Sequence, residues 1–366
     1  MITWKHYNPV QIIAGLDSRK EIANYLPNTG KILLVTTKGM VERGTINEFT
    51  NFLTLPYEIF IAAPEPDLDI LDKYFFENKE QEFSLVIAIG GGSVIDSAKA
   101  LSCAFAQKEY DLPLQAWLRD KKEKPSIALP LIAMPTTAGT GSEVTPFATI
   151  WDKKNMKKCS LASPVCFPKI AFLDPLFTKT LSWKLTVFSA LDTFSHALES
   201  LWNKHATPLS LFYAMRAINM VMDSLHYIEH DSFDMKNRYR LQEAAMLAGV
   251  AISQNHSSIA HAISYPLTLH YNVPHGLACS AFLLPIMEKV ISENAFMLNL
   301  DESFINKLHE FLTRYKPYVL IRKYCTLSEA QSKINEMFTP ERAGTFVLPL
   351  TTDDVLAILQ KGYELQ

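Results

Sequence analysis

Residues 85–99 of this 366-residue chain are LVIAIGGGSVIDSAK, an aliphatic run followed by three glycines and a helix-forming stretch. The run from Leu85 to Ile89 is typical of a buried strand, and the glycines stand where the backbone must turn sharply. Free N–H groups at a helix start, reinforced by the helix dipole, bind anions such as a pyrophosphate. A phosphate-binding turn is therefore predicted. A plain strand-to-helix turn is the alternative, because the spacing is not GxGxxG.

The segments around this loop alternate between short β-rich runs and amphipathic stretches, a pattern that predicts βαβ units and a parallel sheet. The expected strands are 32–35, 57–61, 85–89, and 127–129 running on to 131–133. The expected helices are 18–26, 41–53 and 67–78. This half of the chain is therefore predicted to be an α/β domain that binds a dinucleotide.

A second loop, PTTAGTGSE at residues 135–143, follows another apolar run and concentrates hydroxyl groups and small residues. Its hydroxyls can bond phosphate or ribose oxygens, although a Ser/Thr/Gly loop without a ligand is an equally good interpretation of this loop alone. An open α/β sheet binds its nucleotide at the carboxyl ends of neighbouring strands. The two loops therefore support each other as a nucleotide site.

Beyond Thr178 glycine becomes rare, and apolar residues recur at helical spacing, as in 209–225 and 239–252. The second half is therefore predicted to be all-helical. The change in composition divides the chain into an α/β domain, residues 1–178, and a helical domain, residues 179–366.

Composition and charge exclude several classes of protein. Lys and Arg total 35 against 38 Asp and Glu, a formal net charge of −3, so no basic field favours nucleic acid or an anionic membrane. The five cysteines are scattered and form no CxxC pair, which argues against a disulfide framework and against a Cys-based zinc site. No signal-peptide pattern and no membrane-spanning apolar stretch is present, so we expect a cytoplasmic protein.

Asp192 and His196 lie four residues apart, which puts a carboxylate and an imidazole on one face of a helix, within reach of one ion. Alone, such a pair is more often a surface hydrogen bond. His261 and His275 support the metal interpretation, and the latter stands in a Pro-His-Gly sequence typical of a helix start. One carboxylate and three imidazoles suit Fe²⁺ or Zn²⁺.

These motifs, GGGSxxDxxK, TTAGTGSEVT, DxxxH and the two later histidines with PHG, together resemble the iron-containing (group III) alcohol dehydrogenase family. The resemblance runs from about Tyr7 to about Pro285. It implies a dehydroquinate-synthase-like N-terminal domain that binds the dinucleotide, an all-α C-terminal domain that binds the metal, and an active site in the cleft between them. It also suggests a homodimer paired through the strand near Val10 to Ile13.

Carried over residue by residue, the resemblance assigns two sets of site residues. The metal ligands are Asp192, His196, His261 and His275. The cofactor-binding residues are Gly91, Gly92 and Ser93 in the first loop, with Asp96 as a further candidate there, and Thr136, Thr137 and Thr140 in the second. The expected metal is Fe²⁺, with Zn²⁺ as the alternative.

One departure from the family pattern concerns the cofactor. Many members that prefer NAD carry an Asp after the second strand, which bonds the adenosine ribose and repels a 2′-phosphate, whereas this chain has Thr37 followed by Lys38. Because the repulsive charge is absent and a cation is nearby, NADP(H) is favoured over NAD(H), and Thr37 is a candidate cofactor contact. The alternative is that both residues merely end a strand.

A second departure lies four residues after the third metal ligand, where many members have a histidine near the substrate and this chain has Tyr265. A phenol can donate a hydrogen bond, but its higher reference pKa makes it a poorer proton relay at neutral pH. The string HAISYPLT, residues 261–268, is similar to the branch that reduces phosphonoacetaldehyde. That branch places a lysine shortly before the string, where this chain has SQNHSS, so a phosphonate would need another partner, such as His256 or an Arg.

The resemblance thus implies hydride transfer between a nicotinamide and a small aldehyde or alcohol, with the metal as a Lewis acid and Tyr265 as the candidate catalytic residue. A bound water or the cofactor ribose are the other candidate proton relays. Two alternative functions are a dehydroquinate-synthase-like cyclase, which regenerates its cofactor in each cycle, and a catalytically silent nucleotide-binding protein. The Asp192 to His196 pair and the two glycine loops favour the dehydrogenase.

Overall fold

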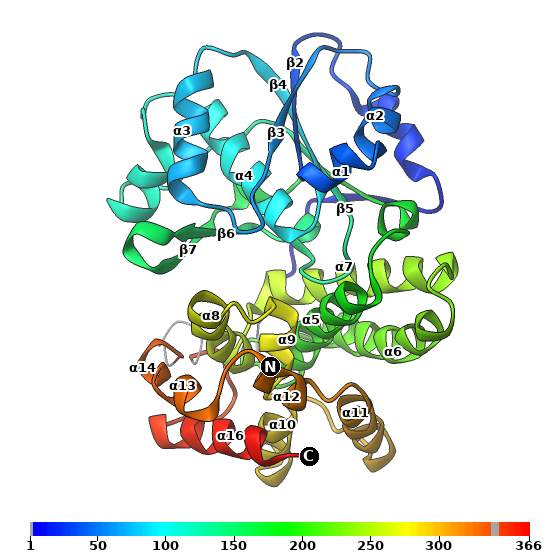
Figure 1. Cartoon of the computed structure of the whole chain (residues 1–366), viewed down its shortest axis with the longest axis vertical. Helices are drawn as coiled ribbons and strands as arrows, with labels where there is room; N and C mark the ends of the chain where they lie inside the picture. The colour runs from blue at the N-terminus through cyan, green and yellow to red at the C-terminus, as the bar shows by residue number, and fades with distance from the viewer. Residues whose placement is uncertain (1–2, 338–343) are drawn as a thin grey trace. The chain divides into compact units, whose positions relative to one another are not determined.

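The computed structural model describes residues 3–337 and 344–366. Its contacts divide the chain into two compact units (Figure 1). The sheet unit comprises Asn8–Leu181 and Phe233–Gln242. The helical unit comprises Met1–Tyr7, Ser182–Ser232 and Glu243–Gln366. The chain therefore passes between the two units more than once.

Six strands form one parallel sheet in the sheet unit, in the order β1-β8-β5-β4-β2-β3. They are β1 (Gln11–Ala14), β2 (Lys31–Thr36), β3 (Tyr57–Ile61), β4 (Phe83–Gly90), β5 (Leu131–Pro135) and β8 (Ile170–Leu173). The predicted α/β fold with a parallel sheet is confirmed. A separate antiparallel pair, β6 (Phe147–Asp152) with β7 (Lys157–Ala162), was not expected from the sequence.

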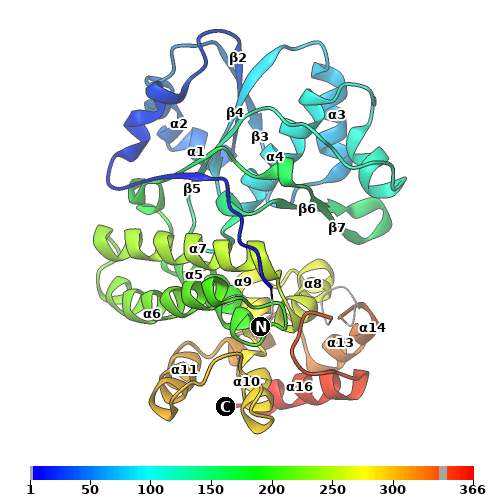
Figure 2. The same ribbon diagram turned by 180° about the vertical axis from the view of Figure 1, so that it is seen from behind.

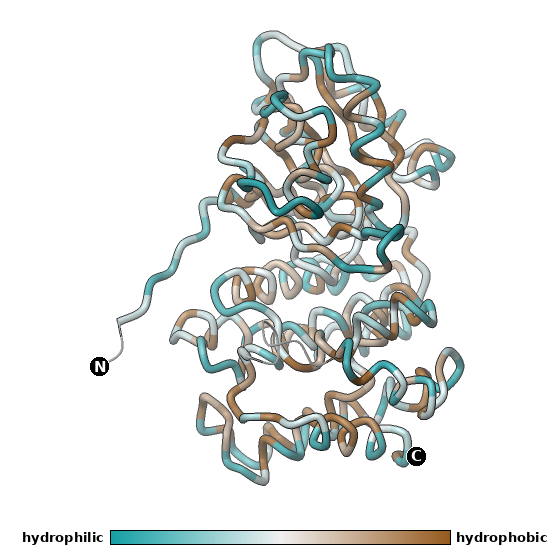
Figure 3. Tube along the Cα trace, turned by 90° about the vertical axis from the view of Figure 1, so that its left-hand side faces the viewer, coloured by the Kyte–Doolittle hydropathy of each residue, from teal (hydrophilic) through white to brown (hydrophobic). Residues whose placement is uncertain are grey.

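Alternation along the strands builds two hydrophobic layers, one on each face of the sheet. In β2, Leu33 and Val35 belong to one core, while Ile32 and Leu34 belong to the other. Such alternation follows from the two-residue period of a strand. Helices α3 (Leu68–Asn78) and α4 (Gly92–Ala106) contribute to the first core, and α1 (Lys38–Glu42) and α2 (Thr45–Thr50) to the second (Figures 1 and 2). Figure 3 shows hydrophobic and hydrophilic stretches interleaved along the trace.

Three of the expected elements differ in the structure. Residues 127–129 are not a strand, because Pro130 lacks an N–H and the Leu129 N–H bonds the carbonyl of Ser102 instead of a neighbouring strand. The helix expected over 41–53 is two short helices, α1 and α2, separated at Gly44, whose φ of 76° is left-handed. The helix expected over 18–26 is a 3-10 helix, η1 (Ser18–Tyr25).

Helices make up the second half of the chain, as predicted. They are α5 (Trp183–Leu201), α6 (Pro208–His230), α7 (Met235–Asn255), α8 (Ile259–Tyr271), α9 (His275–Ser280), α10 (Leu283–Ser292), α11 (Glu302–Tyr315), α12 (Pro317–Leu320), α13 (Leu327–Gln331), α14 (Ile334–Met337) and α16 (Thr352–Glu364). Within the described ranges, none of the helices is both long enough and apolar enough to cross a bilayer.

Candidate metal centre and nucleotide loops

One face of α5 carries three buried ionisable side chains, those of Asp192, His196 and Glu199. Their spacing of four and then three residues aligns them along one side of the helix. Helix α5 begins cleanly, because the hydroxyl of its N-cap residue Ser182 accepts a bond from the N–H of Leu185. The predicted Asp192 to His196 pair therefore lies on a helix, inside the helical unit rather than on its surface.

Helix α9 packs against α5 without room for a side chain at the point of contact. A β-carbon on Gly276 would lie 1.9 Å from the carbonyl oxygen of Phe188 and 3.1 Å from Cβ of Asp192. Only glycine permits this approach. Because His275 precedes Gly276, the contact brings the His275 imidazole next to the α5 carboxylate.

Glu199 fixes the start of α8 and the ring of His261 at the same time. Its carboxylate accepts the backbone N–H groups of Ser258 and Ala260 at 2.9 and 2.6 Å, and that of His261 at 3.2 Å. It also lies 2.6 Å from Nδ1 of His261. A proton on Nδ1 leaves Nε2 as the free lone pair, which is how carboxylates orient metal-binding histidines.

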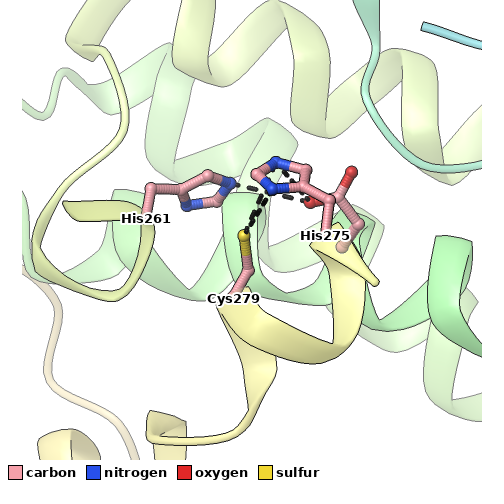
Figure 4. A group of neighbouring side chains, drawn as sticks. His261, His275 and Cys279 are labelled. Carbon is pink, nitrogen blue, oxygen red and sulfur yellow. Dashed lines mark hydrogen bonds and ion pairs between the residues drawn. The ribbon is translucent and has the colours of Figure 1, made fainter. Parts of the chain in front are cut away.

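Four donor groups converge where α5, α8 and α9 meet. Asp192, His261, His275 and Cys279 each offer one ligand atom, and these atoms all lie within 4.8 Å of one another. Asp192 Oδ1 is 3.6 Å from Nε2 of His261 and 3.8 Å from Nε2 of His275. Figure 4 shows the two imidazoles and the thiol pointing toward one another from α8 and α9.

His196, the fourth predicted ligand, lies beside this group and is not one of its four members. Its ring stacks on that of His261, with centroids 4.3 Å apart and an interplanar angle of 19°. Its Nδ1 is 4.0 Å from Asp192 Oδ1. The structure thus brings all four predicted side chains to one place, with His196 at the margin.

The electrostatics of the centre favour a cation. Burial tends to raise the pKa of Asp192, but the imidazoles of His196, His275 and His261 outweigh it and hold that pKa well below its usual range. Burial tends to lower the pKa of His261, but the facing acidic groups, Cys279 foremost and then Glu199, raise it well above its ordinary value. The centre thus attracts positive charge, which a divalent cation can supply by displacing a proton.

Two buried atoms support the fit of a metal. Asp192 Oδ1 and His261 Nε2 are each buried without a hydrogen-bond partner among the described residues. Leaving such atoms unpaired is costly, and native structures seldom do so without a water or an ion. The donor set of one carboxylate and neutral imidazoles is that of a borderline divalent ion. The residues present therefore fit a bound Fe²⁺ or Zn²⁺.

Tyr265, the predicted catalytic residue, lies on the more exposed side of the centre. Its ring stacks on that of His275, with centroids 5.9 Å apart and an interplanar angle of 17°. The His275 side chain is 35% exposed, whereas the other three donors are buried. The phenol of Tyr265 is thus next to the one donor that solvent reaches.

The predicted cofactor residues gather at one edge of the sheet. Gly91, Gly92 and Ser93 form the start of α4 after β4, Thr136, Thr137 and Thr140 follow β5, and Thr37 follows β2. Strands β5, β4 and β2 are neighbours, so their carboxyl ends lie side by side. The chain runs outward from β2 to β3 and then back across to β4, and such a switch point is where open α/β sheets bind nucleotides.

Close packing holds the two loops against each other. A β-carbon on Gly92 would lie 2.5 Å from Cγ2 of Thr140. Asp96 accepts bonds from the Ser142 hydroxyl and the Thr149 N–H, at 2.6 and 2.8 Å, so its carboxylate ties α4 to the second loop and to β6. The buried ammonium of Lys99 donates to the same Ser142 hydroxyl at 2.9 Å.

Sequence reasoning missed two residues of the metal centre, Glu199 and Cys279. Glu199 follows Asp192 by seven residues, the same helical face that predicted His196. Cys279 follows His275 by four residues, one turn further along α9. The helical spacing that revealed the first pair was therefore available for both.

Comparison with known proteins agrees with this architecture. A family description, "Iron-containing alcohol dehydrogenase", matches residues 9–175, and its companion for the C-terminal part of the family matches residues 186–316. Sulfoacetaldehyde reductase of Bilophila wadsworthia is 30% identical over 281 residues, 75% of this chain and 72% of the relative. The chain belongs to the iron-containing alcohol dehydrogenase family. The predicted family is thereby confirmed, and membership favours the dehydrogenase over the cyclase and the silent protein.

Other relatives extend the comparison. Phosphonoacetaldehyde reductase of Streptomyces viridochromogenes is 38% identical over 204 residues, a match that spans 54% of this chain and only 51% of that relative. Sulfoacetaldehyde reductase from Bifidobacterium kashiwanohense, solved in complex with NAD+, has a TM-score of 0.88 at 24% identity, and the match covers 100% of both chains. At that identity the likeness concerns the fold.

Replacing Gly276 with alanine tests the contact between α9 and α5. Gly276→Ala should destabilise the chain by about 1–3 kcal/mol, as overpacking does, and should also weaken Zn²⁺ binding because His275 moves away from Asp192. Urea unfolding and Zn²⁺ titration of metal-stripped protein measure the two effects. Gly362→Ala is the control, since its β-carbon would press on the ring of Phe282, 2.6 Å away, instead of on α5. Unchanged Zn²⁺ affinity in Gly276→Ala would contradict this account.

Replacing Glu199 tests whether it orients His261. Glu199→Gln keeps the size of the side chain but loses the charge that attracts the Nδ1 proton, so Zn²⁺ affinity should fall by about 10–100-fold. Competition with a chromophoric chelator measures this affinity. The exposed Glu310→Gln is the matched control and should bind Zn²⁺ as the unaltered chain does. Equal affinities in the two variants would mean that Glu199 only caps α8.

Proposed function

We propose that this chain is a metal-dependent NAD(P)(H) alcohol dehydrogenase that works as a reductase of small aldehydes. The observation that carries the proposal is the convergence of Asp192, His261 and His275. Within this group, Asp192 Oδ1 and His261 Nε2 are buried without hydrogen-bond partners in the described chain. Family membership supports the nicotinamide as redox partner. Asp192, His196, His261 and His275 are the proposed metal ligands.

When bound, a divalent cation polarises a carbonyl oxygen as a Lewis acid, and a reduced nicotinamide supplies hydride to the carbonyl carbon. The protein's part is binding and orientation. Asp192 holds negative charge at the centre, and Glu199 keeps Nε2 of His261 available as a donor. The N–H groups at the start of α4, near Gly92 and Ser93, offer a site for a pyrophosphate.

Tyr265 is the proposed proton donor to the reacting oxygen. Its ring lies against His275, the most exposed of the donors, which is where a substrate can approach. A phenol in that position can donate a hydrogen bond as negative charge develops on the oxygen. A water or a ribose hydroxyl is the alternative donor.

The metal is proposed to be Fe²⁺, with Zn²⁺ as the alternative, because carboxylate and imidazole donors suit both ions. For the dinucleotide we propose NADP(H) in preference to NAD(H). The hydroxyl of Thr37 accepts a hydrogen bond from the N–H of Met40. A threonine at this position carries no negative charge that would repel a 2′-phosphate. Lys38 is 80% exposed at the same place, next to Glu42. The NAD+ complex of the Bifidobacterium relative speaks for use of NAD(H) as well.

Aldehydes that carry an acidic group on the carbon next to the carbonyl are the proposed substrates. The names of two relatives, a phosphonoacetaldehyde reductase and a sulfoacetaldehyde reductase, support this class, and phosphonoacetaldehyde is the first compound to test. His256, a candidate partner for such an anion, is exposed just beyond the end of α7. Partial desolvation of its ring by neighbouring atoms, and then the nearby His205, lower the pKa of His256, which disfavours the cationic form that an anion would need.

A cytoplasmic homodimer is the proposed form of the protein, paired through β1. This strand ends the sheet, with β8 as its neighbour, and Ile12 on it is 36% exposed. An edge strand with free backbone groups is a template for pairing with a second copy. Light scattering of the full chain tests the dimer.

We also propose that the boundary between the two domains lies between residues 178 and 179, close to the division after Leu181 between the two compact units.

An aldehyde panel with and without metal tests the proposed function. Metal-stripped protein should show no turnover, and Fe²⁺ or Zn²⁺ should restore NADPH oxidation with phosphonoacetaldehyde, sulfoacetaldehyde or acetaldehyde. Running each aldehyde with NADPH and with NADH gives the cofactor preference as a ratio of kcat/KM. Full turnover in protein shown to be free of metal would overturn the Lewis-acid role. Absence of turnover with every metal and aldehyde would remove the reductase proposal.

The role of Tyr265 has its own test. Tyr265→Phe should lower kcat for aldehyde reduction by about 100-fold, the lower end of what general acid catalysis contributes, while metal content stays the same. Steady-state kinetics and metal analysis measure both quantities. Tyr271→Phe is the matched control on the same helix, where the hydroxyl bonds the carbonyl of Glu329. If Tyr265→Phe keeps its kcat, a water or the ribose supplies the proton.

A further inference from the structure

We propose that His226 and His230 form a second binding site for a borderline divalent cation such as Zn²⁺, Ni²⁺ or Cu²⁺. Both imidazoles are exposed on α6, a helix that contributes no residue to the centre around Asp192. The inference does not rest on the proposed function, because it concerns a different helix and an ion with no part in hydride transfer.

The spacing of the two histidines puts both rings on one side of the helix. Residues 226–230 are HYIEH, so the imidazoles are four residues apart, just over one helical turn. Two histidines at this spacing on a helix are the arrangement by which several zinc enzymes hold their ion. Because both side chains are exposed, each can turn a ring nitrogen toward an ion without a change in the core.

The distance between the rings agrees with one shared ion. Their centroids are 5.0 Å apart, and the ring planes are at 85° to each other. An ion about 2.1 Å from each ring nitrogen, in tetrahedral geometry, separates the two centroids by roughly 5 Å. The observed spacing is therefore compatible with both rings binding one ion, and water molecules complete its coordination.

The place of the pair on α6 favours a cation. His230 is the last residue of the helix, where the final carbonyls lack intrahelical partners and carry the negative end of the helix dipole. Asp231 follows directly, and Asp223 lies one turn before His226 on the same side of the helix. Negative charge thus lies on both sides of two neutral donors.

The glutamate between the two histidines is engaged elsewhere. In the related H-E-x-x-H arrangement of zinc peptidases, the glutamate acts as a general base. Here the Glu229 carboxylate accepts a bond from the guanidinium of Arg314 on α11, at 2.7 Å. The site therefore binds an ion and has no hydrolytic role.

The donor set determines which ions the site accepts. Imidazole nitrogen suits Zn²⁺, Ni²⁺ and Cu²⁺, whereas Mg²⁺ and Ca²⁺ prefer oxygen ligands, and Cu²⁺ should bind most tightly of these ions. With two protein donors, this site should hold Zn²⁺ more weakly than the proposed centre, which has four. The full chain should then bind two Zn²⁺ ions of unequal affinity.

Calorimetric titration of the metal-stripped full chain with Zn²⁺ tests the site. The unaltered chain should show one tight and one weaker site. His226→Gln should lose the weaker site and keep the tight one, since replacement of an exposed side chain leaves the core intact. His309→Gln is the matched control, because it removes an exposed imidazole on α11 that has no histidine four residues away, and it should keep both sites.

The outcomes separate this inference from the proposed function. Retention of the weaker site in His226→Gln, or its absence from the unaltered chain, would overturn the inference and leave the proposed centre in place. If the weaker site is present and depends on His226 while no chain shows the tight one, the second site stands and the proposed metal centre falls.

Chemical modification gives a second measurement that needs no variant. Diethyl pyrocarbonate acylates the unprotonated nitrogen of exposed imidazoles, and a bound ion occupies that nitrogen. Zn²⁺ at ten times the dissociation constant of the weaker site fills about nine tenths of it, so modification of His226 and His230 should slow by about 10-fold. The rate at His309 should not change. Mass spectrometry of peptides measures these rates, and equal rates with and without Zn²⁺ at the pair would contradict the assignment.

Discussion

The way in which α5, α8 and α9 pack together depends on one constraint, the buried negative charge of Asp192. An ionised carboxylate away from water is costly unless opposite charge and hydrogen bonds compensate it. Compensation comes from one imidazole on α5 itself and two that α8 and α9 carry in, so these helices must meet α5 at set positions. Gly276 allows α9 to approach α5 closely, and Glu199 fixes both the start of α8 and the orientation of the His261 ring.

Much of the sheet unit could be predicted from the sequence, because inner strands such as β4 and β5 are buried on both faces and form aliphatic runs. The strand at 85–89 and the turn that follows it are of this kind. The failures are local. Pro130 delays one strand, Gly44 divides one helix, and the hairpin of β6 and β7 has no run long enough to stand out. Each failure depends on a single backbone group or on pairing between segments, which periodicity does not report.

In the candidate site, too, local spacing could be predicted from the sequence, and contacts between distant segments could not. Asp192 and His196 share a helical face, so their proximity follows from spacing alone. His261 and His275 are candidates by residue type and by the Pro-His-Gly turn, and the family resemblance assigns them as ligands, because spacing does not say which helices will touch. The absence of CxxC pairs says nothing about a lone cysteine, and Cys279 reaches the centre through the packing of α9 on α5. Side chains drawn from three helices converge through tertiary contacts, which no window of sequence contains.

The fit at Gly276 also bears on how such a centre can change during evolution. Position 275 is exchangeable in principle, since any side chain with a suitable donor atom could stand there and tune the ion. The residue after it has no such freedom, because even one methyl group would collide with the backbone of α5. Changes in metal preference among descendants of this chain should therefore arise from replacement of its donor residues, while the achiral glycine beside them is retained.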